Sequence, residues 1–221
     1  MASIKRAVLG GMLAAGLAVA PVMAGADYVD HPEARAFIDR MVEEHGFDRG
    51  RLEQLLGGAK KQQSILDAIS RPAEAKPWHE YRPIFLTDSR IRQGVAFWRE
   101  HADLLAEVEK AYGVPPEVVV AIIGVETRYG SYTGRHAVLD SLATLSFDYP
   151  SRAAFFSGEL EAFLLLAREE GLDPTQATGS YAGAMGMPQF ISSSYRRYAV
   201  DFGEDGQRDL WYSPADVTGS V

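Results

Sequence analysis

Residues 115–130 read PPEVVVAIIGVETRYG, and this stretch decides the fold. A proline pair followed by Glu117 is typical of a helix start, because proline fits the first turn and an acidic side chain suits the positive end of the helix dipole. Valine and isoleucine also favour strands, but the prolines and the glutamate favour a helix. No polar side chain interrupts residues 118–123, so we expect this helix to be buried on all sides.

Glu126 lies where the apolar run ends, close to Ile122 and Ile123 at helical spacing. Apolar surroundings disfavour the charged form of a carboxyl group and raise its pKa, and a proton held near neutral pH is what a general acid needs. Glu126 is therefore a candidate catalytic acid. The alternative is a charged residue that ends a helix and turns to water, because perturbed acids mark functional sites only statistically.

Composition limits the class of protein. The chain has 221 residues, is 47% hydrophobic and contains no cysteine. It is long enough for one large or two modest globular domains, and it can form no disulfide, thiolate metal site or cysteine nucleophile. A net charge of −8 argues against nucleic acid as the main partner.

The N-terminus has the pattern of a secretory signal peptide. Lys5 and Arg6 precede an apolar segment at residues 7–19, and small residues follow up to Ala24. A membrane anchor is the weaker alternative because the segment is short for a span. We therefore expect a signal peptide at 1–24, cleavage and export, with no stable membrane anchor.

The rest of the chain reads as a helical region with a connector at 25–86, followed by a larger domain at 87–221. Strand signals are sparse, so we expect a mainly helical protein. One long helix is predicted from Asp88 to Gly113, with these residues facing inward: Ile91, Val95, Trp98, Leu105 and Val108. Within the connector, prolines forbid a long helix, and Tyr81 either packs against the domain or lines a sugar-binding cleft.

Residues 178–190 read TGSYAGAMGMPQF, in which small residues alternate with tyrosine, methionine and glutamine. Small residues let a backbone approach a ligand closely, and polar groups can orient it. Tight packing without a ligand explains the same composition.

Residues 201–211 read DFGEDGQRDLW and match an EF-hand loop in part. The third position is Gly203, which offers no side-chain oxygen, and Tyr212 stands where an acidic residue is expected, with Asp216 four residues later. The loop is either a calcium site or an acidic turn without metal.

A glycosidase needs two carboxylates that flank the scissile bond, and around Glu126 no second one stands out. Asp140 and Asp148 are possible, but nothing in their sequence context selects them. His136 is the only histidine nearby, and no paired spacing suggests zinc.

Together these segments resemble the lytic transglycosylases of the membrane-bound B type (glycoside hydrolase family 103). The resemblance covers nearly the whole mature chain and is carried by GVETRYG at 124–130, YPSR at 149–152, SGELE at 157–161, SYAGAMG at 180–186, QF at 189–190, Tyr195 and YAVDF at 198–202. It implies a lysozyme-like (α+β) catalytic domain at 87–221 with an N-terminal helical domain and an EF-hand-like loop. Members continue beyond the equivalent of Val221, so the C-terminal part of the family domain is expected to be missing and residues 25–221 alone to have weak or absent activity.

The resemblance also implies a reaction on the glycan strands of peptidoglycan in the periplasm. Glu126 protonates the glycosidic oxygen between N-acetylmuramic acid and N-acetylglucosamine, then accepts the proton of the muramyl C6 hydroxyl, which attacks C1 and forms a 1,6-anhydro ring. One group that acts as acid and then base needs no second carboxylate. The chemistry requires no cofactor, and cell-wall synthesis enzymes are possible partners.

By position, the family implies further site residues. Ser180 and Gln189 would contact the sugar beside the scissile bond, Tyr81 and Phe190 would shape the cleft, and Arg152 would bind stem-peptide carboxylates. Asp201, Asp205, Gln207 and Asp216 match the family's calcium loop, as a structural Ca²⁺ site. A calcium-stabilised murein-binding module without turnover is the alternative function.

Overall fold

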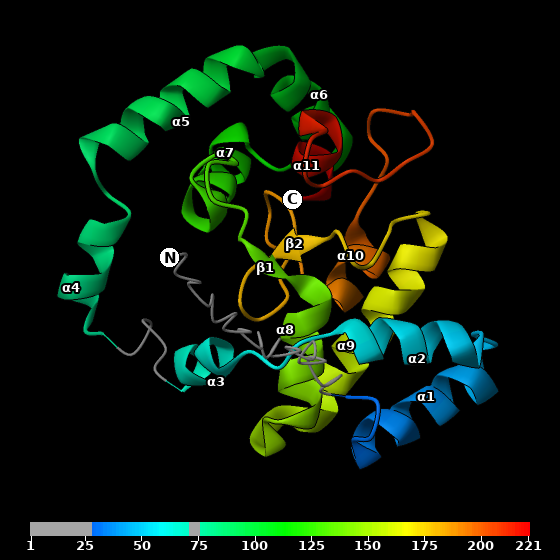
Figure 1. Ribbon diagram of the computed structural model, residues 1–221. Helices are drawn as coiled ribbons and strands as arrows, with labels where there is room; N and C mark the ends of the chain where they lie inside the picture. The colour runs from blue at the N-terminus through cyan, green and yellow to red at the C-terminus, as the bar shows by residue number, and fades with distance from the viewer. Residues whose placement is uncertain (1–27, 71–75) are drawn as a thin grey trace, which may run out of the picture.

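The computed structural model describes residues 28–70 and 76–221, so the expected signal peptide lies outside the described residues. The fold is mainly helical (Figure 1). Its helices are α1 (Pro32–His45), α2 (Arg49–Gly58), α3 (Gln63–Ile69), α4 (Trp78–Tyr81), α5 (Asp88–Glu100), α6 (Ala102–Tyr112), α7 (Pro116–Thr127), α8 (Val138–Phe147), α9 (Ala153–Glu169), α10 (Ser192–Tyr198) and α11 (Pro214–Ser220). Two short 3₁₀ helices, η2 (Arg82–Ile84) and η3 (Pro150–Arg152), and two strands, β1 (His136–Ala137) and β2 (Thr178–Gly179), complete the described part.

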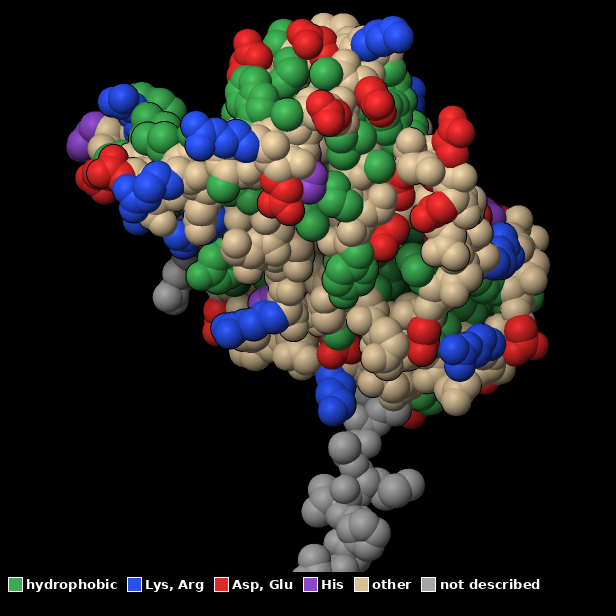
Figure 2. Space-filling model, turned by 90° about the horizontal axis from the view of Figure 1, so that it is seen from above, with side chains coloured by type: hydrophobic (Ala, Val, Ile, Leu, Met, Phe, Trp, Pro, Cys, Tyr) green, Lys and Arg blue, Asp and Glu red, His purple; other side chains and the backbone are tan. Residues whose placement is uncertain are grey.

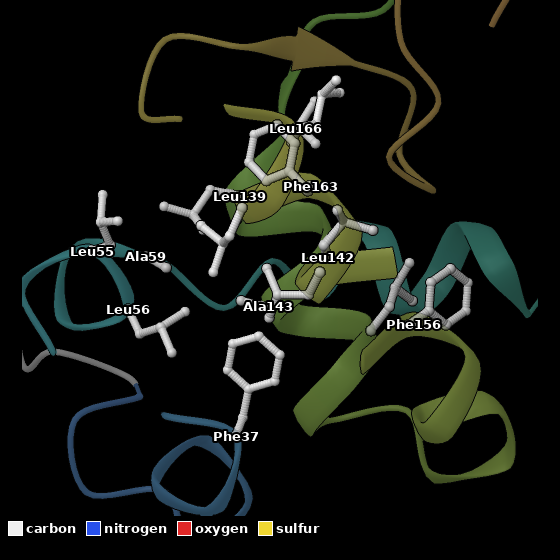
Figure 3. Packing of buried hydrophobic residues seen from close by; sticks show 14 of the residues in the cluster. Phe37, Leu55, Leu56, Ala59, Leu139, Leu142, Ala143, Phe156, Phe163 and Leu166 are labelled. Atoms are coloured by element: carbon white, nitrogen blue, oxygen red, sulfur yellow. The ribbon is translucent and has the colours of Figure 1, made fainter. Parts of the chain in front are cut away.

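The larger core joins the first three helices to α8 and α9. Figure 3 shows Phe37 from α1 and Leu56 from α2 pointing toward Ala143 of α8, with Phe163 of α9 close by. These side chains are almost completely buried, so the N-terminal helices and the later helices share one apolar cluster. The expected division between residues 86 and 87 stays a prediction.

The first two helices begin and end where the sequence signals them. Gly46 ends α1 in the left-handed conformation at φ 64°, which glycine adopts without steric cost. The carboxylate of Asp48 accepts a hydrogen bond from the backbone N–H of Arg51 at 2.7 Å and caps α2.

The prediction of one long helix from Asp88 to Gly113 is wrong. This segment forms two helices, α5 and α6, that meet at His101. The backbone of His101 leaves the helical region, at φ −112° and ψ 26°, and its ring packs against Phe97 at 4.5 Å. The predicted inward face is also wrong over the first half. The buried residues of α5 are Gly94 and Phe97, and these three side chains are exposed: Ile91, Val95 and Trp98.

A second, smaller core lies between α5, α6, α7 and α11, and it buries only one side of α7. Val119, Val120 and Ile123 face this core. The expectation that α7 is buried all round is wrong: its opposite face carries exposed apolar side chains, namely Val118 at 43%, Ile122 at 38% and Val125 at 47% exposure. An apolar run without polar breaks therefore leaves an apolar surface next to Glu126.

The strands β1 and β2 form an antiparallel pair in which His136 lies opposite Gly179. This pair holds the loop after α7 against the loop that begins at β2. Among the described residues, no helix combines the length and apolar character needed to cross a membrane.

Candidate active site

Glu126 is the next-to-last residue of α7. Directly after the helix, Arg128 and Tyr129 have positive φ angles of 52° and 57°, and Gly130 follows at 79°. Three consecutive left-handed residues turn the chain sharply and cost free energy at the two non-glycine positions. The turn therefore has to be held by its surroundings.

Helix α5 supplies that support. The Arg90 guanidinium donates to the backbone carbonyl of Gly124 at 2.8 Å. The Arg128 side chain reaches back to α5, where it donates to Gln93 Oε1 at 2.6 Å and to Ser89 Oγ at 2.9 Å. Both guanidinium groups thus fix the end of α7 relative to α5.

Tyr129 fits between α5 and α7 at two glycines. A Cβ atom at Gly94 would lie 2.4 Å from the Tyr129 hydroxyl oxygen, and one at Gly124 would lie 2.5 Å from it. Burial raises the pKa of Tyr129, while the nearby positive charge of Arg90 opposes this. The ring is therefore neutral, and it fills the space that the two glycines leave between the helices.

Burial raises the pKa of the Glu126 carboxyl group above its ordinary value of 4.5, as the sequence predicted. No neighbouring charge contributes to this shift within the described part of the chain. The residue as a whole is nevertheless exposed to solvent, so its proton is reachable. This combination is what a general acid requires.

Thr127 connects this helix end to the glycine-rich segment. Its hydroxyl donates to the backbone carbonyl of Met187 at 2.8 Å and accepts from the N–H of Gly130 at 3.1 Å. The segment 178–190 is thereby fixed beside Glu126. Apart from its position next to the candidate acid, nothing in the sequence marks Thr127.

Ser180 opens a tight loop directly after β2. Its hydroxyl oxygen accepts from the N–H groups of Ala182 at 3.3 Å and Ala184 at 3.0 Å, and its own N–H donates to the carbonyl of Ala184 at 2.8 Å. These bonds fix the hydroxyl on a rigid loop.

Gln189 has a positive φ of 53°, and its side-chain amide nitrogen donates to the carbonyls of Thr133 at 3.1 Å and Gly186 at 2.9 Å. The side chain therefore spans the two loops on either side of the site. Phe190 pairs with Met185 through two backbone hydrogen bonds. Both Gln189 and Phe190 line a cavity of about 540 Å³ whose other walls come mainly from α6, α10 and α11, and Glu126 is not among the residues that line it.

Two further predicted site residues lie on other elements. Tyr81 ends α4, where its ring contacts Phe85 at 5.0 Å and Trp78 at 6.4 Å. Figure 1 shows α4 set apart from α7, and Figure 2 shows Lys and Arg side chains gathered on the lobe at the left that carries it. Arg152 ends η3 and stacks over Phe155, with 4.3 Å from its guanidinium carbon to the ring centre. The described contacts bring neither residue to Glu126.

The acidic loop brings three of its predicted ligands together. One carboxylate oxygen from each of Asp201, Asp205 and Asp216 lies within 4.8 Å of the others. Asp216 is completely buried, and its oxygens accept backbone hydrogen bonds from Phe202, Gly203 and Asp209 at 2.9–3.0 Å. The other two carboxylates also accept loop N–H groups. This all-oxygen set fits a hard cation such as Ca²⁺.

Comparison with known proteins identifies the family. The described part of the chain is mainly helical, and its candidate acid, Glu126, lies near the end of α7. The Transglycosylase SLT domain family matches residues 30–221. The chain is 49% identical over 207 residues to membrane-bound lytic murein transglycosylase B of Escherichia coli (strain K12), an alignment that covers 89% of this chain and 57% of that protein.

Solved structures agree. Soluble lytic transglycosylase SltB1 from Pseudomonas aeruginosa matches with a TM-score of 0.83 and 56% identity over 86% of this chain and 64% of its own. Escherichia coli Slt35 in complex with calcium matches at 0.84 and 50% over 89% and 63%. Pseudomonas aeruginosa SltB3 in complex with NAG-NAM-pentapeptide matches at 0.77 and 36% over 85% and 50%.

The chain therefore belongs to the transglycosylase SLT-domain family, among the relatives of lytic murein transglycosylase B. The expected family and the expected lysozyme-like, mainly helical fold are confirmed. The chain spans 57% of the length of its curated relative and 64% or less of these three solved chains.

Proposed function

We propose that this protein is a lytic transglycosylase that cleaves the β-1,4 bond between N-acetylmuramic acid and N-acetylglucosamine in peptidoglycan. The observation that carries the proposal is the position of Glu126. It lies near the end of α7, beside the loop of Ser180 and Gln189 that Thr127 holds there, and partial burial raises its pKa. The reaction of the family uses one carboxyl group first as acid and then as base, so it needs no second carboxylate of the kind that a hydrolase places across the bond.

In the first step, the Glu126 acid donates its proton to the glycosidic oxygen, and the bond between that oxygen and muramyl C1 breaks. In the second step, the resulting carboxylate accepts the proton of the C6 hydroxyl of the same sugar, and that oxygen bonds to C1. The product carries a 1,6-anhydro ring, and no water is consumed. Glu126 returns to its acid form, which closes the cycle.

The residues around Glu126 would position the sugar. We assign Ser180 and Gln189 to the sugar beside the scissile bond, because both are held rigidly on the loop that Thr127 fixes next to Glu126. Phe190, on the same loop, supplies apolar surface. For Tyr81 and Arg152 the support is the family resemblance and the chemistry of the side chains, an aromatic ring for a sugar and a guanidinium for a stem-peptide carboxylate.

The products of digestion test this proposal. Incubated with purified murein, the protein should release fragments that end in anhydromuramic acid, each lighter by one water than the fragment that lysozyme-type hydrolysis yields. Mass spectrometry of the soluble fragments checks this, with long incubation so that weak turnover is still detected.

Fragments with reducing ends as the main products would replace the proposal with a hydrolase. Binding to murein without any release of fragments would replace it with the murein-binding module that lacks turnover.

We further propose that the loop formed by Asp201, Asp205 and Asp216 holds a structural Ca²⁺, with the main-chain carbonyl of Gln207 as an additional ligand. The grouping of three carboxylate oxygens around a fully buried Asp216 supports this. Because Gly203 supplies no ligand, we expect weak affinity, with a dissociation constant of about 0.1–1 mM. The ion would stabilise the structure and take no part in the chemistry.

Calcium should raise the thermal unfolding midpoint. At a concentration about a hundredfold above the dissociation constant, the free energy of unfolding should increase by roughly 2.7 kcal/mol. Scanning calorimetry with Ca²⁺, and with Mg²⁺ as the comparison ion, measures this. The shift should disappear in Asp205→Ala, whose side chain is exposed; an equal shift in that variant would mean that the loop is an acidic turn and calcium acts elsewhere.

The site of action would be the periplasm, where peptidoglycan is found and where the expected signal peptide would deliver the chain. Cell-wall synthesis enzymes are the partners that such an activity would meet, because cleavage of glycan strands has to be matched by new synthesis.

A further inference from the structure

A second cavity, of about 190 Å³, lies away from Glu126 between two segments: residues 172–178 on one side and Trp211 with Tyr212 on the other. None of the site residues proposed above lines it. Its walls combine aromatic rings with a carboxylate, an amide and a hydroxyl, so its chemistry can be read from the side chains that form it.

The aromatic wall is a rigid turn. One carboxylate oxygen of Asp209 accepts the backbone N–H groups of Trp211 at 2.8 Å and Tyr212 at 3.0 Å. The N–H of Asp209 in turn donates to the buried Asp216 at 2.9 Å. The acidic loop therefore fixes the backbone of both aromatic residues.

The orientation of the Trp211 ring is fixed as well. Its indole N–H donates to the carbonyl of Thr178 at 3.2 Å, and the ring packs against the buried Tyr195 with 5.8 Å between centroids. Tyr212 is 84% exposed, which is unusual for a large aromatic side chain on a rigid turn. An exposed ring next to an oriented ring forms a platform that is ready for a ligand.

The polar wall is also ordered. Asp173 accepts hydrogen bonds from the backbone N–H of Thr175 at 2.9 Å and from its hydroxyl at 2.7 Å, and these bonds lower the pKa of Asp173. The carboxylate is therefore ionised at neutral pH. Gln176 follows on the same wall and brings an amide group to the cavity.

Aromatic faces beside a carboxylate and an amide suit a sugar ring. A pyranose presents a face of C–H groups, which packs against aromatic rings, and a rim of hydroxyl groups, which donate strong hydrogen bonds to a carboxylate. The volume is below the roughly 300–1,000 Å³ of sites for drug-sized ligands, so it suits one sugar ring. The negative charge of Asp173 disfavours sugars with acidic substituents, which favours N-acetylglucosamine over muramic acid and its peptide.

We propose that this cavity is a secondary binding site for an N-acetylglucosamine residue of the glycan strand, separate from the catalytic cleft. Naming murein as the polymer rests on the proposed function. The cavity is connected to the loop of Ser180. The indole N–H of Trp211 donates a hydrogen bond to Thr178 of β2, and β2 leads directly into that loop. A glycan held here would keep the protein on polymeric murein while the catalytic cleft acts on a different segment.

The test measures binding without turnover. Chains that carry Glu126→Gln are sedimented with purified murein sacculi, and the bound fraction is measured against murein concentration. In this background Tyr212→Ala combined with Asp173→Asn should weaken binding by about tenfold, as expected when a hydrogen bond to a charged acceptor and an aromatic contact are lost. Tyr212→Phe keeps the ring and should bind like its parent, and Asp67→Asn, also at an exposed aspartate, controls for charge.

A parallel measurement separates this site from the cleft. In chains with Glu126 intact, the double change should leave cleavage of a short soluble glycan unchanged and slow the cleavage of sacculi. Unchanged binding to sacculi in the double variant, or an equal loss in Asp67→Asn, would refute the secondary site while leaving the proposed function in place. An equal loss of cleavage of the short glycan would also refute it, because Tyr212 and Asp173 would then act in the catalytic cleft or in the stability of the fold. Absence of all cleavage in the parent would instead count against the proposed function.

Discussion

Glu126→Gln should reduce murein cleavage at least about a hundredfold and leave the fold intact, because a positioned general acid contributes roughly 10²–10⁴-fold to the rate. The amide keeps the shape of the side chain but has no proton to donate to the leaving oxygen. The rate of anhydromuramyl product formation measures the loss. Glu117→Gln is the matched control: it lies on the same helix, is exposed, and should retain full activity.

The same variant has a predicted signature in stability. Because burial raises the pKa of Glu126 above 4.5, the folded protein keeps this proton at pH values where the unfolded chain has lost it. The contribution of Glu126 to stability is therefore present at low pH and is lost as pH rises through the raised pKa. Over that rise, the unfolding midpoint of Glu126→Gln should fall less than that of the unchanged protein, while cleavage by the unchanged protein declines.

Retention of more than about a hundredth of the activity in Glu126→Gln would exclude Glu126 as the general acid, since such a loss lies below the usual contribution. An equal loss of activity in Glu117→Gln would point to damage to α7 as a whole. The two changes together separate chemistry from support of the helix.

The sequence predicts α7 and the raised pKa of Glu126 well, because both depend on local signals. Pro116 and Glu117 start the helix as expected, and apolar neighbours raise the pKa of Glu126 as expected. The all-round burial of the helix was wrong because periodicity gives no face to a run in which every residue is apolar. Which side of α7 is covered depends on α5, α6 and α11, and their packing is a matter of tertiary structure.

The α5–α6 region shows the opposite case, in which a correct helical pattern was joined in the wrong way. The break at His101 involves neither glycine nor proline, so no local signal marks it. The apolar spacing continues through the break, so it predicts core positions for Ile91 and Val95, which are exposed. Leu105 and Val108, beyond the break, are buried as predicted.

The supporting residues of the site were missed because their role depends on distant partners. Arg90 and Tyr129 act across α5 and α7, and nothing in their own segments indicates these contacts. Gly124, a glycine inside an apolar helix, was the available signal, since such a glycine often marks a close approach. The grouping of Asp201, Asp205 and Asp216 was easier to predict, because the three residues lie within one short segment.

Gly134→Ala should be among the most damaging single changes in this protein. Gly134 has a φ of 96°, and a Cβ atom there would lie 2.0 Å from the carbonyl carbon and oxygen of Gly179. These are backbone atoms of β2, so no side-chain rotation relieves the clash. We expect a loss of about 3 kcal/mol or more in the free energy of unfolding, from left-handed strain of roughly 1–2 kcal/mol together with overpacking of roughly 1–3 kcal/mol.

Murein cleavage should fall together with stability. The clash would push the loop of Gly134 away from the segment of Gly179, and these two segments position the candidate site residues. The backbone carbonyl of Thr133 accepts a hydrogen bond from the side-chain amide of Gln189, and Gly179 immediately precedes Ser180. Gly113→Ala is the matched control: its φ of 73° is also positive, yet a Cβ atom there meets nothing within 4 Å. That variant should lose only the strain of roughly 1–2 kcal/mol and keep its activity. Denaturant unfolding of both variants decides the matter: equal losses would show that backbone strain alone acts at Gly134 and that the clash with Gly179 is relieved without further cost in stability.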